Sequence, residues 1–414
     1  MDRNASYNQG IVFYLFLFMC IVFPVNFEIF QGIRILDILS IVFIFLQIRP
    51  TIKINKSILT LISVNIIILF LSEINGFLSD KVFNSFGIAF YYKYIMVIVI
   101  PLMIINLKLT KKQIIIIFNA IFISSILLSL WVFLYLWLTN EQLLTGNNRP
   151  SYPFSSDYSM TDSHLLSSYL SFFLVTYTLY LNKILKHGSM FSFVVSLLLI
   201  SSIIMTGAKT GILIMILAAM YALFRAILTP FRINRKYFIT GIFFLILIAL
   251  LYYYFSSHPP SFSNNYSFLL ERSFSFNLLN DASSLGRVAK LIEAFHEVYD
   301  NYYLIGNGMM VMNQDWYDGL ISHLIARSGL MGFVFFMLLM SYILYYTRRN
   351  STNMFHKHVF TLLFLLYLFI NLITEYFLVF RGYFPTIVVL ILIYKYGKIS
   401  EITCEKSTTI HFQK

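Results

Sequence analysis

Twelve apolar runs, separated by polar segments, constrain this chain more than any other feature. Runs of about 17 to 25 apolar residues match a helix that crosses a hydrocarbon layer, whereas a membrane β-barrel shows alternation over about ten residues. Only 12% of the residues are charged, which is about half the share in a soluble domain. The sequence therefore predicts an all-α, polytopic membrane protein. The expected spans lie near 11–28, 33–48, 58–72, 83–106, 113–138, 164–182, 190–206, 210–227, 237–255, 319–346, 358–379 and 383–397.

The basic residues predict how these spans are oriented. With the N-terminus inside and the spans alternating, most of the 30 Lys and Arg fall in inside segments, although the outside segments are longer. Because cytoplasmic loops of membrane proteins are enriched in Lys and Arg, we expect both termini to be cytoplasmic. This placement accounts for much of the net charge of +12, and we expect no nucleic-acid partner. The expected parts are spans one to nine (1–255), an external loop (256–318), spans ten to twelve (319–397) and a cytoplasmic tail (398–414).

Ten basic residues lie instead at or near the expected external face. A cation in or beside a span is costly unless it is paired or faces a water-filled cavity. One such residue alone could simply reach lipid phosphates, but a group on one face suits pyrophosphate or another polyanion. We therefore expect an anionic substrate. The ten residues are Arg34, Lys81, Lys93, Arg149, Lys209, Arg272, Arg287, Lys290, Arg327 and Arg381.

The external loop contains an amphipathic pattern. From Ser283 to Tyr299, apolar residues recur at three- and four-residue spacing, which predicts a helix lying on the membrane surface or over the mouth of a cavity. Arg287 falls in its first turn, and Lys290 follows one turn later. The Gly306-Asn307-Gly308 turn beyond this helix could bring backbone N–H groups close to an anion.

His323 and Arg327 lie four residues apart where the external loop meets the tenth span. This spacing places an imidazole and a guanidinium on one face of a helix. His323 could act as a general base, and the alternative is an interfacial histidine bonded to a loop carbonyl. The two cysteines, Cys20 and Cys404, and the His, Asp and Glu residues show no metal-site spacing, so we expect neither a metal nor a cofactor.

The segment from Arg287 to Gly332 resembles the family of O-antigen polymerases and ligases. That family has an arginine, a (P)LFGxGxG turn and an HNxxLxxxxExGxxG segment that runs into a span. Here Arg287 is followed by Leu304-Ile305-Gly306-Asn307-Gly308, and His323 by Ser328-Gly329-Leu330-Met331-Gly332. Met205-Thr206-Gly207-Ala208-Lys209-Thr210-Gly211 is similar to the family's TxSRTG turn. Asn148-Arg149-Pro150 is similar to its arginine-bearing outer segment.

Three positions depart from the family pattern. Lys209 stands where the family has arginine, Leu324 where it has asparagine, and Arg327-Ser328 where it has an acid before the last glycines. These departures favour a polymerase, the more variable branch of the family. The resemblance then implies an enzyme of the bacterial inner membrane. Such an enzyme transfers a growing glycan from undecaprenyl pyrophosphate onto a lipid-linked repeat unit at the periplasmic face.

The charge pattern and the resemblance together assign roles to six residues. We expect His323 and Arg287 to be catalytic, and Lys209, Arg149, Arg327 and Lys290 to bind the pyrophosphate or glycan. The expected partners are an undecaprenyl-pyrophosphate-linked oligosaccharide and membrane lipids, and the resemblance also admits a chain-length regulator protein.

Three other functions stay open at the level of sequence. A ligase of the same family would transfer the finished glycan to the lipid A core with the same residues. A flippase for lipid-linked oligosaccharides would place its cations within the helix bundle and needs no large outer loop. A solute transporter would show two repeated halves with broken helices at matching positions, and we find no such repeat in the sequence.

Overall fold

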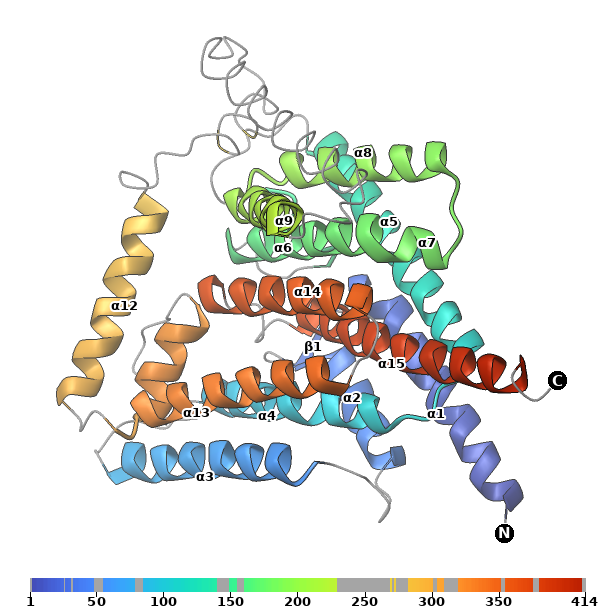
Figure 1. The fold of residues 1–414 in the computed structure, drawn as a ribbon. Helices are drawn as coiled ribbons and strands as arrows, with labels where there is room; N and C mark the ends of the chain where they lie inside the picture. The colour runs from blue at the N-terminus through green and yellow to red at the C-terminus, as the bar shows by residue number, and fades with distance from the viewer. Residues whose placement is uncertain are drawn as a thin grey trace, which may run out of the picture. The chain divides into compact units, whose positions relative to one another are not determined.

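The computed structural model is mainly α-helical and divides into two units, each of which is considered separately (Figure 1). The first unit comprises Met1–Ile117, Leu278–Thr361 and Asn371–Lys414, and the second comprises Phe118–Asn277 and Leu362–Ile370. The structure describes residues 2–25, 27–30, 33–47, 55–78, 85–139, 149–154, 160–228, 269, 272, 282–300, 304–308, 319–350, 354–374 and 380–411.

The helices of the first unit are α1 (Asp2–Val22), α2 (Ile35–Gln47), α3 (Lys56–Leu78), α4 (Ser85–Asn106), α12 (Ala282–Asp300), α13 (Leu320–Asn350) and α15 (Phe380–His411). Those of the second unit are α6 (Met160–Thr176), the π-helix η2 (Tyr177–Leu181), α7 (Asn182–Ile184), α8 (Ser189–Met205) and α9 (Lys209–Leu228). Two further helices, α5 (Lys111–Leu138) and α14 (Met354–Ile373), contribute residues to both units.

A small hairpin between α1 and α2 departs from the all-α prediction. After the short 3-10 turn η1 (Phe23–Val25), strand β1 (Glu28–Phe30) pairs antiparallel with β2 (Ile33–Arg34). The backbone N–H of Arg34 then donates to Asp37 Oδ2 over 2.7 Å, which satisfies an unpaired amide at the start of α2. The few residues available between two apolar helices suffice for a hairpin but not for another helix.

Six described helical segments are long and apolar enough to cross a membrane: Lys56–Leu78, Lys111–Leu138, Ser163–Ile184, Leu320–Asn350, Met354–Leu372 and Gly382–Ile399. Five shorter apolar segments accompany them: Gln9–Val25, Ile35–Gln47, Tyr92–Asn106, Ser189–Met205 and Lys209–Tyr221. Each segment falls on a predicted span, and the predicted ninth span (237–255) lies outside the described residues. The helical fold with several apolar helices is confirmed, while the count of twelve spans stays a prediction.

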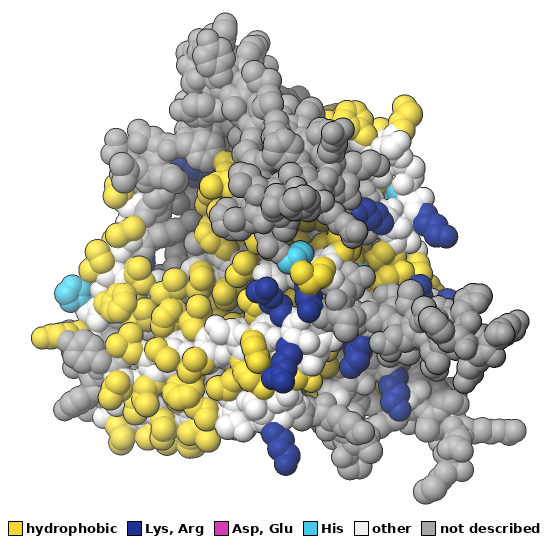
Figure 2. Space-filling view, in the orientation of Figure 1, with side chains coloured by type: hydrophobic (Ala, Val, Ile, Leu, Met, Phe, Trp, Pro, Cys, Tyr) yellow, Lys and Arg dark blue, Asp and Glu magenta, His cyan; other side chains and the backbone are white. Residues whose placement is uncertain are grey.

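The surface of the first unit suits a lipid environment. Ile67 and Phe70 of α3 and Val334 and Leu338 of α13 are all exposed. Figure 2 shows hydrophobic side chains covering the region of α3 and α13, with Lys and Arg gathered nearer the right of the view. An apolar surface this extensive is unusual on a water-soluble protein and expected where lipid tails cover the helices.

Small side chains position the helices of the second unit. The α6 helix packs against α8 and α9, and Gly211 of α9 lies so close to Ser167 and Ser171 of α6 that a Cβ at this glycine would overlap both hydroxyls. Ser125 of α5 and Tyr169 of α6 share a hydrogen bond of 2.7 Å. Close approach at small and polar residues is how helices associate in membranes.

The α13 helix bends sharply at Gly329, which has φ 69° and ψ −177°. The segment before the bend packs with α12, and the longer segment after it runs along α3 (Figure 1). The sequence predicted one continuous span at 319–346, and the bend corrects this prediction. Since the segment after Gly329 has about 20 residues, it alone is long enough to cross a membrane.

The amphipathic helix predicted from Ser283 is present as α12. Its Ala294 and Ala326 of α13 form a fully buried contact, and in Figure 1 the helix runs across the direction of α3 and α4. Its apolar stripe is 45% to 63% exposed, at Leu285, Val288, Ile292, Phe295 and Tyr299. A helix that lies in the membrane interface has this orientation and turns such a stripe toward lipid.

Spin labels on α12 test this placement. In a background without Cys20 and Cys404, we expect a nitroxide on Ile292→Cys to be several-fold more accessible to oxygen than to a water-soluble nickel complex, because oxygen concentrates in the hydrocarbon. A label on Glu293→Cys, on the neighbouring polar face, should show the reverse in the same electron paramagnetic resonance measurement. Equal nickel accessibility at the two positions would place the stripe in water.

Candidate functional site

Each unit contains a fully buried arginine. Arg149 in the second unit and Arg327 in the first are each 2% exposed. A buried charge is costly unless hydrogen-bonding groups or an opposite charge compensate it. Because positions of this kind in membrane proteins are commonly functional, each arginine is the starting point for a candidate site in its own unit.

In the second unit, the side chain of Arg149 lies against the turn between α8 and α9. Its Nη1 donates to the carbonyl oxygen of Gly207 over 3.0 Å, and its Nη2 lies 3.5 Å from His164 Nε2. Gly207 has a φ of +63°, and a Cβ there would lie 2.8 Å from the side chain of Leu269 and 3.4 Å from Arg149 Cδ. The turn is thus shaped around the guanidinium, and it lies between the predicted spans 190–206 and 210–227.

Lys209 is the first residue of α9 and is half-buried beside the same turn. Two contacts hold the start of α9 on α6: Thr210 Oγ1 donates to the carbonyl oxygen of His164 over 3.4 Å, and Ser167 Oγ donates to that of Ala208 over 3.5 Å. The structure therefore brings the two predicted cations Arg149 and Lys209 to one turn. It adds His164, which was not among the predicted site residues.

His164 carries a weak signal in the sequence. It stands at the start of the predicted sixth span, and an ionisable residue at the end of a span is a candidate for function. Its relation to Arg149 depends on the fold, because the two residues belong to different elements and meet only where α6 and the α8–α9 turn come together.

In the first unit, His323 and Arg327 lie on the segment of α13 before the bend. Both are buried, at 4% and 2% exposure, and the backbone N–H of His323 donates to the carbonyl oxygen of Gly319 over 3.2 Å. The predicted helix through the two residues is confirmed. Because they are four positions apart in the sequence, they lie one turn apart on the same side of this segment.

Residues 304–308 form a clamp on the bend of α13. The amides of Asn307 and Gly308 donate to the carbonyl oxygens of Ala326 (3.1 Å) and Arg327 (2.9 Å). Met331 N–H donates back to the carbonyl oxygen of Leu304 over 3.3 Å. These bonds satisfy carbonyl groups that the bend leaves without a partner in the helix. The expectation that the Gly306-Asn307-Gly308 amides bind an anion is therefore wrong at Asn307 and Gly308, since both already donate within the protein.

Two side chains of α3 complete this region. Asn75 Nδ2 donates to the carbonyl oxygen of Gly306 over 3.2 Å. A Cβ on Gly308 would lie 2.5 Å from Glu73 Oε2, and Glu73 is only 4% exposed. In the sequence Glu73 appears only as an acid within a span, whereas the structure places its carboxylate against the backbone that binds Arg327.

The two predicted cations of α12 are Arg287 and Lys290, and the structure describes the side-chain contacts of Lys290 only. Arg287 lies in the helix two turns before the buried Ala294, and its side chain lies outside the described ones. Lys290 Nζ lies 3.0 Å from Glu293 Oε2, with both side chains partly exposed. An exposed pair of this kind contributes little to stability, but it compensates the Lys290 charge in the absence of another anion.

The predicted external loop is described only at Leu269, Arg272, 282–300 and 304–308. Within the described part of the chain, no group of three or more His, Cys, Asp or Glu residues could hold a metal ion. The second unit offers a buried guanidinium, a histidine and a lysine at a helix start, and the first unit offers a buried guanidinium, a histidine and a carboxylate.

Comparison of the chain with models of protein families, with curated proteins and with solved structures finds no match. The resemblance to O-antigen polymerases and ligases thus stays a prediction from the sequence.

Proposed function

We propose that this protein is an O-antigen polymerase of the bacterial inner membrane. It transfers a growing glycan from undecaprenyl pyrophosphate onto a lipid-linked repeat unit at the periplasmic face. The observation that carries the proposal is that each unit has a buried arginine and a histidine close to it. Arg149 contacts His164, and Arg327 follows His323 by one helical turn.

This pair of residue types fits the reaction. A hydroxyl oxygen of the acceptor sugar forms a bond to the anomeric carbon of the donor glycan, and the bond from that carbon to the pyrophosphate breaks. Undecaprenyl pyrophosphate leaves with the bonding electrons, and the proton of the hydroxyl passes to a base. An arginine can hold a phosphate oxygen pair with two parallel hydrogen bonds, and a histidine can accept the proton.

Burial increases what these cations contribute. Charges act more strongly in surroundings of low polarity, and donors fixed before the reaction cost no reorganisation when charge develops on the leaving group. The bond to the Gly207 carbonyl fixes Arg149 in this way. The clamp at 304–308 fixes the backbone of Arg327. Lys209, Lys290 and Arg287 add positive charge for the pyrophosphate, and His323 is the proposed base.

Gel ladders of the surface polysaccharide test the function. Arg287→Ala and His323→Ala are each expected to abolish long chains and to leave single repeats on the core, because a cation or the base is lost while the repeat is still made and flipped. Protein level in the membrane should equal that of the wild type. Arg349→Gln, an exposed change, should keep the full ladder.

Two outcomes would contradict the proposal. If a deletion strain carries no repeat at all on its core, the protein is a ligase, because a missing polymerase still lets single repeats be attached. Transport of a lipid-linked repeat across vesicles by the purified protein, without extension of the glycan, would show a flippase. Long chains in both variants would show that neither Arg287 nor His323 is needed for glycan extension.

A further inference from the structure

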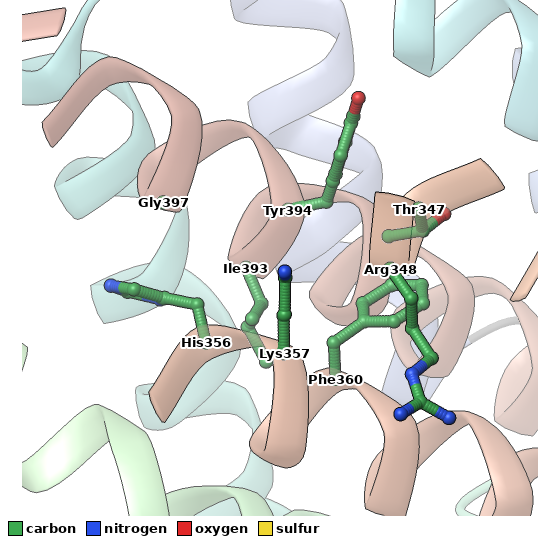
Figure 3. A pocket seen from close by; sticks show the side chains of 8 residues that line it. All are labelled: Thr347, Arg348, His356, Lys357, Phe360, Ile393, Tyr394 and Gly397. Atoms are coloured by element: carbon green, nitrogen blue, oxygen red, sulfur yellow. The ribbon is translucent and has the colours of Figure 1, made fainter. Parts of the chain in front are cut away.

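A small pocket opens where α13, α14 and α15 meet in the first unit, at the end of α13 opposite to His323 and Arg327. Its lining includes Arg348, His356, Lys357, Phe360, Ile393 and Gly397. Figure 3 shows the side chains in the order His356, Lys357, Phe360 and Arg348 across the opening. Two cations thus stand on either side of an aromatic ring.

The wall of this pocket is apolar although its rim is basic. Phe360 and Ile393 are buried, and they come from different helices. A Cβ on Gly397 would lie 3.2 Å from Cγ of His356, so the glycine lets the imidazole lie close against α15. The pocket therefore combines a positive rim with a hydrocarbon-like interior.

The two cations of the rim are available to a ligand. Neither Arg348 nor Lys357 forms an ion pair with any acidic side chain that the structure describes. Their neighbour Arg349 behaves differently, because its Nη1 donates to the hydroxyl of Tyr345 over 3.2 Å. Lys398 is exposed and does not line the pocket. Basic residues at helix ends are common as orientation signals, but orientation alone does not require two of them to line one opening.

We propose that this pocket binds the phosphate of an anionic phospholipid. Arg348 and Lys357 hold the phosphate oxygens, since a guanidinium offers two parallel donors and an ammonium a compact charge. The first part of the acyl region lies beside Phe360. Inorganic phosphate shares the headgroup chemistry, but the apolar wall at the end of three apolar helices favours a lipid, and basic pockets of this kind between helices suit anionic headgroups.

Native mass spectrometry of the full-length protein in neutral detergent tests the proposal. Phosphatidylglycerol, cardiolipin and phosphatidylcholine are the probes. The wild type should retain phosphatidylglycerol or cardiolipin and not phosphatidylcholine. Arg348→Gln combined with Lys357→Gln should lower retention of the anionic lipids about thirtyfold, because each of the two cations contributes on the order of 1 kcal/mol near a headgroup. Arg349→Gln combined with Lys398→Gln removes the same charge and should change retention little.

Three results would overturn this assignment. Equal loss of lipid from the two double variants would show general surface attraction. Displacement of phosphatidylglycerol by millimolar inorganic phosphate would assign the pocket to a free anion. A photoreactive phosphatidylglycerol should attach within 354–360 of the wild-type protein, and attachment only elsewhere would exclude the pocket even if a variant failed to fold. None of these outcomes depends on whether the protein extends a glycan.

Discussion

Arg149→Lys is expected to slow glycan extension by about a hundredfold or more, although the positive charge is kept. A lysine ammonium has no planar fork, so it cannot bond to the Gly207 carbonyl and still present two parallel donors to a phosphate. Loss of one fixed donor to a developing anion typically costs a factor of about 10² to 10³. The rate is measured as glycan extension on a lipid-linked repeat by purified protein in vesicles.

Arg349→Lys is the matched control for this substitution. Arg349 is exposed and bonds to Tyr345 of its own helix, so the same chemical change should leave the rate within about twofold. His164→Gln should also lower the rate, because the contact with Arg149 Nη2 at 3.5 Å helps to orient the guanidinium. Wild-type rates in both Arg149→Lys and His164→Gln would show that the turn between α8 and α9 takes no part in glycan extension. Thermal unfolding of each variant separates a slow enzyme from a misfolded one.

The helices could be predicted from the sequence because lipid leaves few alternatives. An apolar run of about 20 residues must satisfy its backbone groups internally, and a helix does so within one segment. The turn at Gly207 was also predictable, since Gly207 and Lys209 stand in the short gap between two apolar runs. The helix of α12 followed from the spacing of its apolar residues.

The site could be predicted only in part. Arg149 and Lys209 stood out as cations where orientation does not require them, but His164 joins them through a contact between separate elements. The role of Gly306-Asn307-Gly308 was misjudged for a related reason. The sequence indicated a glycine-rich turn with backbone amides that could donate to an anion. It did not indicate the bend at Gly329, which leaves the carbonyl oxygens of Ala326 and Arg327 to accept hydrogen bonds from these amides.

Gly308→Ala and Gly329→Ala are expected to destabilise the first unit by about 2 to 6 kcal/mol each. Both glycines have positive φ, at +79° and +69°, a conformation that costs other residues about 1 to 3 kcal/mol. A Cβ on Gly308 would also lie 2.5 Å from Glu73 Oε2, and one on Gly329 would lie 2.5 Å from the Leu304 carbonyl oxygen. Forcing atoms into packed space adds about 1 to 3 kcal/mol.

Gly286→Ala provides the opposite result from the same chemical change. This glycine lies inside α12 with nothing within 4 Å of an added Cβ. Alanine there should therefore stabilise the helix, by about 0.5 to 1 kcal/mol. Thermal unfolding in detergent is the measurement, with a melting temperature lower by roughly 5 °C or more for the two clamp variants. If Gly308→Ala and Gly329→Ala melt like Gly286→Ala, residues 304–308 do not hold the bend of α13. Other contacts would then have to hold the backbone of Arg327, whose carbonyl oxygen accepts the hydrogen bond from Gly308 N–H in this clamp.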